Sequence, residues 1–181
     1  MAEMLFCFAG ECDARALCDM YMEKTKWFAA RGIEQWDAEY ISKNYSEGRI
    51  AGYARSGSFV VLRAGGEILA GHALLQSCDK WPFSEPNCMY IDCLVSRAPG
   101  AGKALLAKTI EHCRARGVAK LKLDCQDHNE RLKRYYADIG FEEVGKARHK
   151  VFADRRSCLM ELGLTIDAAD WRKGGPAWTN E

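Results

Sequence analysis

The sequence has little excess charge and no long apolar run. Its 181 residues carry 26 Lys and Arg against 25 Asp and Glu, which gives a formal net charge of +1. This balance argues against general electrostatic binding to nucleic acid or to an anionic membrane, so we expect neither as a partner. No stretch approaches the ~18 uncharged apolar residues of a transmembrane helix. The first residues include acids where an export signal would need a basic start, so we expect a cytoplasmic protein.

Paired cysteine motifs are also missing, although the sequence has nine cysteines. No Cys-x-x-Cys pair occurs, and the closest candidates for a ligand pair are Cys7 with Cys12 and Cys88 with Cys93. Residues at that spacing would face opposite sides of a strand, whereas a structural zinc site needs two close ligand pairs. An odd count without an export signal predicts reduced thiols. We therefore expect no metal, and we expect most of the cysteines to be small buried residues.

Internal repeats, low-complexity tracts and an obvious interdomain linker are absent as well. At this length a single domain is the default, and it can bury roughly 70% of the surface of the unfolded chain. We expect one folded domain over residues 1–163 and a C-terminal tail over residues 164–181, where Gly-Gly-Pro interrupts any regular pattern.

Hydrophobic periodicity predicts the element order β-α-α-β-β-β-α-β-α-β-β. The expected strands cover residues 4–8, 59–62, 68–75, 88–95, 120–125, about 141–149 and 157–163. The expected helices run from residue 13 to a stop near 32, over 37–45, from about 102 to a cap at 117, and over 129–139. Antiparallel hairpins followed by two helical crossovers predict an α/β (α+β) fold. Its mixed, mostly antiparallel sheet should have about seven strands flanked by four helices.

Three local patterns refine this order. The pair Gly65-Gly66 between two apolar runs predicts a hairpin turn. The glycines and polar residues of Gly48 to Gly57 predict a loop. In the strand near 120–125, apolar residues alternate with Lys120, Lys122 and Asp124, which predicts a half-buried strand.

The residues with the clearest chemistry lie where the strand near 88–95 runs into a helix. The turn between them holds Arg97, Gly100 and Gly102, and Lys103 follows. Backbone N–H groups at a helix N-terminus can approach phosphate oxygens closely where glycines leave room, and the two cations add positive charge. A Walker loop does not fit, because position 97 holds Arg and position 104 holds Ala. The dinucleotide fingerprint does not fit either, because position 105 holds Leu.

Two segments together carry a family resemblance. Residues 97–102 match the pattern Gln/Arg-x-x-Gly-x-Gly/Ala, and Asn129 begins a segment with the spacing Asn-x6-Tyr-x3-Gly-Phe, in which the tyrosine is Tyr136. In this order they resemble the coenzyme A pyrophosphate loop and a later helical segment of the GNAT N-acetyltransferase superfamily. The resemblance spans roughly residues 3–163, and it implies the GNAT fold for that part of the chain.

The resemblance implies an acetyl-CoA-dependent N-acetyltransferase in which an amine attacks the thioester directly. It assigns Asn129 to the pantetheine arm and Tyr136 to the thiol, where the tyrosine would act as catalytic acid toward the leaving sulfur. Two helix cations, Lys133 and Arg134, become candidate partners of the coenzyme phosphates. The implied coenzyme contacts are Cys93, Leu94, Val95, Arg97, Ala98, Pro99, Gly100, Ala101, Gly102, Lys103, Asn129, Lys133 and Tyr136.

The general base stays open at the level of the sequence. Asp92 in the strand near 88–95 is one candidate for this catalytic role, and His72 and Glu34 are others; a chain of water molecules would also serve. The concentration of Trp27, Trp36, Trp81 and Phe83 in the sequence around the expected acceptor region predicts an aromatic-lined pocket.

We expect the acceptor to be a small-molecule amine, and nothing in the sequence identifies it. Two alternatives remain open: a non-catalytic acetyl-CoA-binding sensor or scaffold, and a peptide or protein N-acetyltransferase. An exposed last strand would allow a homodimer.

Overall fold

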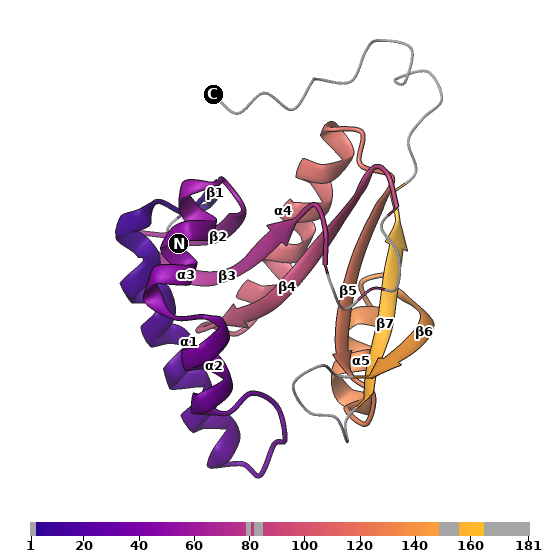
Figure 1. Cartoon of the computed structure of the whole chain (residues 1–181). Helices are drawn as coiled ribbons and strands as arrows, with labels where there is room; N and C mark the ends of the chain where they lie inside the picture. The colour runs from indigo at the N-terminus through magenta and orange to yellow at the C-terminus, as the bar shows by residue number, and fades with distance from the viewer. Residues whose placement is uncertain (1–2, 79–80, 82–84, 149–155, 165–181) are drawn as a thin grey trace. The chain divides into compact units, whose positions relative to one another are not determined.

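The computed structural model describes residues 3–78, 81, 85–148 and 156–164 (Figure 1). Its strands are β1 (Met4–Phe8), β2 (Phe59–Ala64), β3 (Glu67–Leu75), β4 (Cys88–Ser96), β5 (Lys120–Gln126), β6 (Glu142–Arg148) and β7 (Arg156–Gly163). The short 3-10 turn η1 (Glu11–Asp13) precedes the helices α1 (Ala14–Ala29), α2 (Ala38–Asn44), α3 (Glu47–Arg55), α4 (Ala101–Ala115) and α5 (Glu130–Ala137).

The strands belong to one seven-stranded sheet with the order β1-β2-β3-β4-β5-β7-β6. Strands β4 and β5 are parallel, and the pairs β1–β2, β2–β3, β5–β7 and β6–β7 are antiparallel. The predicted fold class is therefore confirmed. The predicted number of helices is wrong, because the described residues form five helices in place of four.

The chain divides into two compact units, residues 1–74 with 92–106 and residues 75–91 with 107–181. The expectation of a single domain over residues 1–163 stays a prediction. Nearly all of the expected tail, residues 165–181, lies outside the described residues.

In the first unit, β1, β2 and β3 form an antiparallel meander next to the first three helices (Figure 1). The two-residue turn between β2 and β3 has left-handed backbone angles at Gly65 and Gly66, with φ of 58° and 87°. Such a turn matches the twist of the strands that it joins and needs residues that tolerate positive φ. The hairpin predicted from the glycine pair is confirmed.

Residues 48–57, which we expected to form a loop, contain most of α3. Ile50 and Ala54 lie one helical turn apart, and both are buried. Helix α3 packs against α1, and burial of this apolar stripe outweighs the weak helix propensity of Gly48 and Gly52. The helix ends before Gly57, whose φ is 62°.

In the second unit, β7 lies between β5 and β6, with α5 against β5 (Figure 1). The last strand in the chain, β7, is therefore not an edge strand: among the described strands, β6 takes that edge. The N-terminal part of β4 pairs with β5 from Cys88–Lys120 to Tyr90–Lys122.

Lys122 contradicts the simple alternation predicted for β5, because its side chain is completely buried. Its ammonium lies 2.8 Å from a carboxylate oxygen of Glu85 and 3.9 Å from one of Glu161. The same ammonium lies 4.4 Å from the ring centroid of Trp81. Two carboxylates and an aromatic face replace water around the charge, so the strand can bury a lysine.

Candidate active site

The end of β4 has an unusual backbone at Cys93, which adopts a φ of 55°. Inside a strand, this left-handed conformation is typical of a bulge, where glycine is the usual residue. The hydroxyl of Tyr21, which lies on α1, donates a hydrogen bond of 2.6 Å to the carbonyl oxygen of Cys93. The ring of Tyr21 is fully buried. A buried tyrosine of the first helix therefore contacts the backbone of the strand at its distorted residue.

The residue before Cys93 is Asp92, which is half-buried. The hydroxyl of Tyr45 donates a short hydrogen bond to a carboxylate oxygen of Asp92. The rings of Tyr21 and Tyr45 have centroids 5.3 Å apart, and Trp36 lies 6.0 Å from Tyr21. Burial raises the pKa values of both tyrosines well above their ordinary value, so both are neutral donors at pH 7.

The other two candidate bases lie in different environments. His72 on β3 is fully buried, and burial lowers its pKa to about 4. Its Nδ1 lies 3.0 Å from the carbonyl oxygen of Ala73, an oxygen that can only accept, so the neutral ring donates from Nδ1. Glu34 is exposed to solvent. Of the three residues, Asp92 is the half-buried carboxylate bonded to a buried tyrosine.

The turn between β4 and α4 has the geometry of an anion-binding loop. The N–H of Arg97 donates to the carbonyl of Leu69 on β3, at 2.8 Å. Gly100 adopts a φ of 77°, and its carbonyl accepts from the N–H of Ala104 at 3.0 Å, which starts the helical pattern of α4. A Cβ added at Gly100 would have no atom within 4 Å. The loop is therefore open above this glycine, in front of the positive end of the helix.

Charge at this loop is basic but partly compensated. The first turn of α4 contains no acidic residue, and Lys103 is exposed. The guanidinium of Arg97 lies 3.2 Å from a carboxylate oxygen of Glu23, and both side chains are partly exposed. Such an exposed pair is weak, so an anionic ligand could replace the carboxylate without a large cost.

The second unit contains the remaining predicted coenzyme residues. Asn129 is the N-cap of α5, and its side-chain oxygen accepts from the N–H of Leu132 at 3.0 Å. Tyr136 is buried in the last turn and packs edge-on against Phe141, with centroids 6.0 Å apart. Asn129 has a φ of −87° and a ψ of 75°, so it precedes the first helical residue of α5.

Lys133, also on α5, lies 2.6 Å from a carboxylate oxygen of Glu130 and 3.9 Å from one of Asp127. The hydrogen bond with Glu130 is the main cause of a raised pKa at Lys133. The ammonium is therefore charged at pH 7, as a phosphate partner would have to be.

The predicted residues fall into two sets. The first unit brings together Asp92, the β4 residues after it, the turn and the start of α4. The second unit holds Asn129, Lys133 and Tyr136. The sequence predicted only the helices that contain Tyr21 and Tyr45, because helical spacing does not show which hydroxyl reaches a strand.

The four aromatic residues expected in an acceptor pocket have different positions. Trp36 joins the rings around Asp92, whereas Trp27 is 39% exposed and stacks with the guanidinium of Arg31 at 4.3 Å. Trp81 belongs to the core of the second unit, and Phe83 lies outside the described residues.

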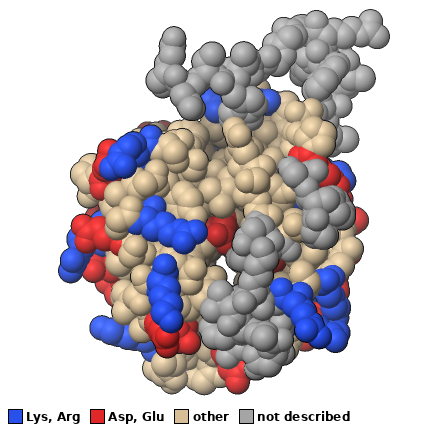
Figure 2. Space-filling view, in the orientation of Figure 1, with Lys and Arg blue, Asp and Glu red and all other residues tan. Residues whose placement is uncertain are grey.

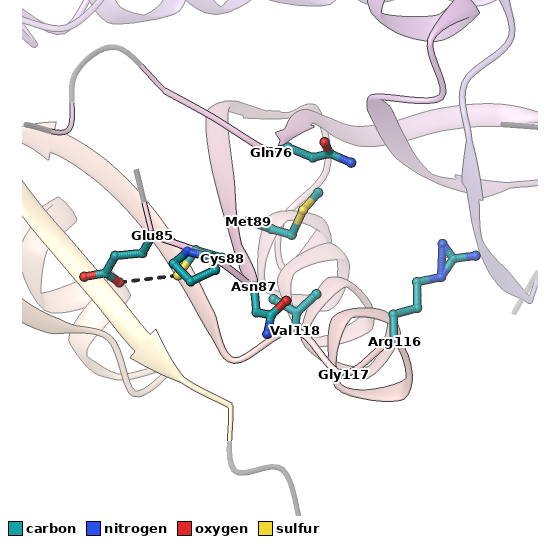
Figure 3. Close-up of a pocket in the computed structure, with 9 residues that line it drawn as sticks. Gln76, Glu85, Asn87, Cys88, Met89, Arg116, Gly117 and Val118 are labelled. Carbon is teal, nitrogen blue, oxygen red and sulfur yellow. Dashed lines mark hydrogen bonds between the residues drawn. The ribbon is translucent and has the colours of Figure 1, made fainter. Parts of the chain in front are cut away.

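The second unit also has a cavity of about 270 Å³. It lies at the start of β4 and the end of α4, and Figure 3 shows that the carboxylate of Glu85 is directed toward Cys88. None of the predicted site residues lines it. The lining residues are Gln76, Glu85, Pro86, Asn87, Cys88, Met89, Arg116, Gly117 and Val118.

The face shown in Figure 2 and the side-chain clusters of the described residues give no second type of site. Lys and Arg side chains alternate with Asp and Glu side chains on the face shown in Figure 2. In the part of the chain that the structure describes, no three His, Cys, Asp or Glu residues are grouped so that they could hold a metal ion. The described helices include none long and apolar enough to cross a membrane. All nine cysteines are described, and all are free thiols, four of them buried.

Comparison with known proteins identifies the family of this arrangement. Residues 14–141 match the model of the Acetyltransferase (GNAT) family. A search of curated proteins by sequence gives no match.

Solved structures share the fold. The PaiA N-acetyltransferase from Thermoplasma acidophilum in complex with coenzyme A is 18% identical, with a TM-score of 0.67 over 89% of this chain and 99% of that chain. YncA from Salmonella typhimurium, a putative acetyltransferase with its cofactor acetyl-CoA, is 19% identical, with a TM-score of 0.63 over 91% of this chain and 96% of that chain. The ribosomal-protein-S18-alanine N-acetyltransferase from Escherichia coli is 16% identical, with a TM-score of 0.64 over 92% of this chain and 97% of that chain.

Proposed function

Because the chain belongs to the GNAT acetyltransferase family, we propose that it transfers an acetyl group from acetyl-CoA to a primary amine of a small molecule. The amine attacks directly while both substrates are bound. Acetyl-CoA as co-substrate is supported by two solved structures of this fold, one with coenzyme A and one with acetyl-CoA.

The turn before α4 supports coenzyme binding. Its backbone lies at the N-terminus of a helix of 15 residues, and Gly100 leaves open space where a side chain would meet a ligand. Arg97 and Lys103 add positive charge at the same place. In this proposal the turn binds the pyrophosphate, and Asn129 and Lys133 bind the pantetheine arm and a phosphate.

The reaction makes one C–N bond and breaks one C–S bond. The amine nitrogen attacks the thioester carbon, the carbonyl oxygen becomes negative, and coenzyme A leaves as a thiol after it gains a proton. Backbone N–H groups of Cys93 to Val95 would stabilise the oxygen, and Tyr136 would donate the proton to sulfur. Asp92 would accept the proton that the amine loses, directly or through water.

The observation that carries this proposal is the pair of adjacent residues Asp92 and Cys93. One is a half-buried carboxylate and the other a distorted strand residue, and a buried tyrosine contacts each of them. An ammonium ion is attracted both by the carboxylate and by the aromatic face of the half-buried Trp36. These groups favour a small amine over a neutral or acidic acceptor.

The test is a calorimetric titration of the purified protein with acetyl-CoA, followed by a thiol-release assay over polyamines, amino acids, aminoglycosides and peptide N-termini. Micromolar binding with release on a small amine is the expected result. Release on peptides alone would favour a protein acceptor, the activity named for the Escherichia coli structure above. Binding without release on any amine would favour the sensor alternative, and no binding would refute the coenzyme site.

A further inference from the structure

Cys93 adopts a backbone conformation that its side chain does not favour. Among the described residues with positive φ, the others are glycines or Asn87, and asparagine is the non-glycine residue that visits this region most readily. Cys93 has a Cβ atom and lacks a polar group that could bond to its own backbone in the manner of asparagine. A residue in such a conformation persists only where its surroundings hold it there.

Tyr21 is the contact that can hold it. Its hydroxyl donates to the Cys93 carbonyl at 2.6 Å, which is a short bond for two neutral groups. The ring cannot turn away easily, because it is fully buried and packs against two other rings. The ring centroids of Tyr45 and Trp36 lie 5.3 Å and 6.0 Å from that of Tyr21. The neutral hydroxyl stays a donor over the whole range in which an acetyltransferase would work.

The direction of that carbonyl also decides the direction of one N–H group. The carbonyl of Cys93 and the N–H of Leu94 belong to the same planar trans peptide, so they point in opposite directions. A bond that fixes the carbonyl toward α1 therefore aims the N–H of Leu94 away from α1.

We propose that Tyr21 is a positioning residue for acetyl transfer. It holds the peptide between Cys93 and Leu94 so that the Leu94 N–H is the donor that meets the thioester oxygen as it becomes negative. This inference rests on the proposed function, and it selects one donor among the N–H groups of residues 93–95. Tyr21 itself touches neither substrate.

The kinetic test replaces Tyr21 by Phe, which removes only the hydroxyl. Loss of a whole oxyanion donor costs about 10²–10³-fold in kcat, so we expect kcat to fall at least ~10-fold for a misaligned donor. The KM for acetyl-CoA should stay within about 3-fold, because the coenzyme contacts assigned to the turn are untouched. Tyr40→Phe is the matched control, because Tyr40 is also buried and its ring centroid lies 6.4 Å from that of Tyr45. In this variant kcat should not change.

The double variant Tyr21→Phe/Cys93→Gly separates positioning from general destabilisation. Glycine tolerates a φ of 55° without the hydrogen bond, so part of the lost kcat should return in the double variant. A purely structural role of the hydroxyl would give no recovery, and that result would overturn the proposal. An unchanged kcat in Tyr21→Phe would overturn it as well.

A crystal structure of Tyr21→Phe provides a readout that does not depend on activity. The expected change is relaxation of Cys93 to negative φ, accompanied by rotation of the peptide between Cys93 and Leu94 through ψ of Cys93 and φ of Leu94. An unmoved peptide would overturn the positioning role even if the enzyme is active. A rotated peptide in a protein that acetylates no amine would leave the contact intact and refute the proposed function alone.

Discussion

Replacement of Gly100 by Glu tests the proposed coenzyme loop most directly. The variant combines two effects that the structure allows us to separate. The first is backbone strain, because Gly100 has a φ of 77° and an L-residue in the left-handed region costs about 1 kcal/mol or slightly more. No steric cost is added, since a Cβ there would meet no atom within 4 Å. For a chain of this size the strain lowers the Tm by about 2–4 °C.

The second effect is electrostatic and requires the ligand. A carboxylate about 4 Å from one negative charge of a pyrophosphate is repelled by about 1 kcal/mol in water and by about 4 kcal/mol at an effective dielectric constant of 20. A loss of about 1.4 kcal/mol weakens binding ten-fold. We therefore expect the Kd for acetyl-CoA to rise at least ~10-fold in Gly100→Glu.

Two control variants isolate these effects. Gly57→Glu has the same strain, because Gly57 has a φ of 62° and open space around its Cβ position, but it lies between α3 and β2. Gly100→Gln has a side chain of the same length at position 100 without the charge. Calorimetric titration and thermal unfolding should show similar Tm losses in all three variants, and the largest loss of affinity in Gly100→Glu. Wild-type affinity in Gly100→Glu, with the expected loss of Tm, would show that this turn does not bind the pyrophosphate.

Three further predictions test other parts of the molecule. Tyr136→Phe should keep acetyl-CoA binding and lower turnover by about 10²-fold; unchanged turnover at saturating amine would exclude Tyr136 as the acid. The pKa of His72 is about 4 in the folded protein, against an ordinary value of 6.5. The unfolded state therefore binds more protons between these values, and the free energy of unfolding should fall by about 1.4 kcal/mol for each pH unit as the pH drops from 6.5 toward 4. Urea unfolding at pH 7 and pH 5 measures this loss, and His72→Gln should show a smaller one. Ile50→Ala should destabilise the protein by about 2–5 kcal/mol, because Ile50 is fully buried; a loss below ~1 kcal/mol would contradict the packing of α3.

The sequence by itself determined the features that depend on local patterns. The hairpin at Gly65 and Gly66 and the strand-turn-helix unit around Gly100 follow from backbone rules that act over a few residues. The family resemblance has the same origin, because its two motifs are short and lie in a fixed order. Asp37 likewise caps α2, accepting from the N–H of Tyr40 at 2.7 Å, within the range predicted for that helix.

Only the tertiary structure decided the features that depend on a distant partner. Helix α3 forms because it packs against α1 and buries Ile50, although its glycines alone favour a loop. Lys122 is buried because Glu85 and Trp81 surround its charge, whereas its place in the alternation predicted solvent. Tyr21 meets Cys93 across 72 positions of sequence, and spacing along a helix indicates only which face is apolar.

Helical and strand periods describe which side of an element is buried, but they do not say which groups from other elements meet there. For that reason the sequence identified the turn before α4 as a candidate coenzyme loop, and the folded chain revealed the tyrosines beside Asp92 and Cys93.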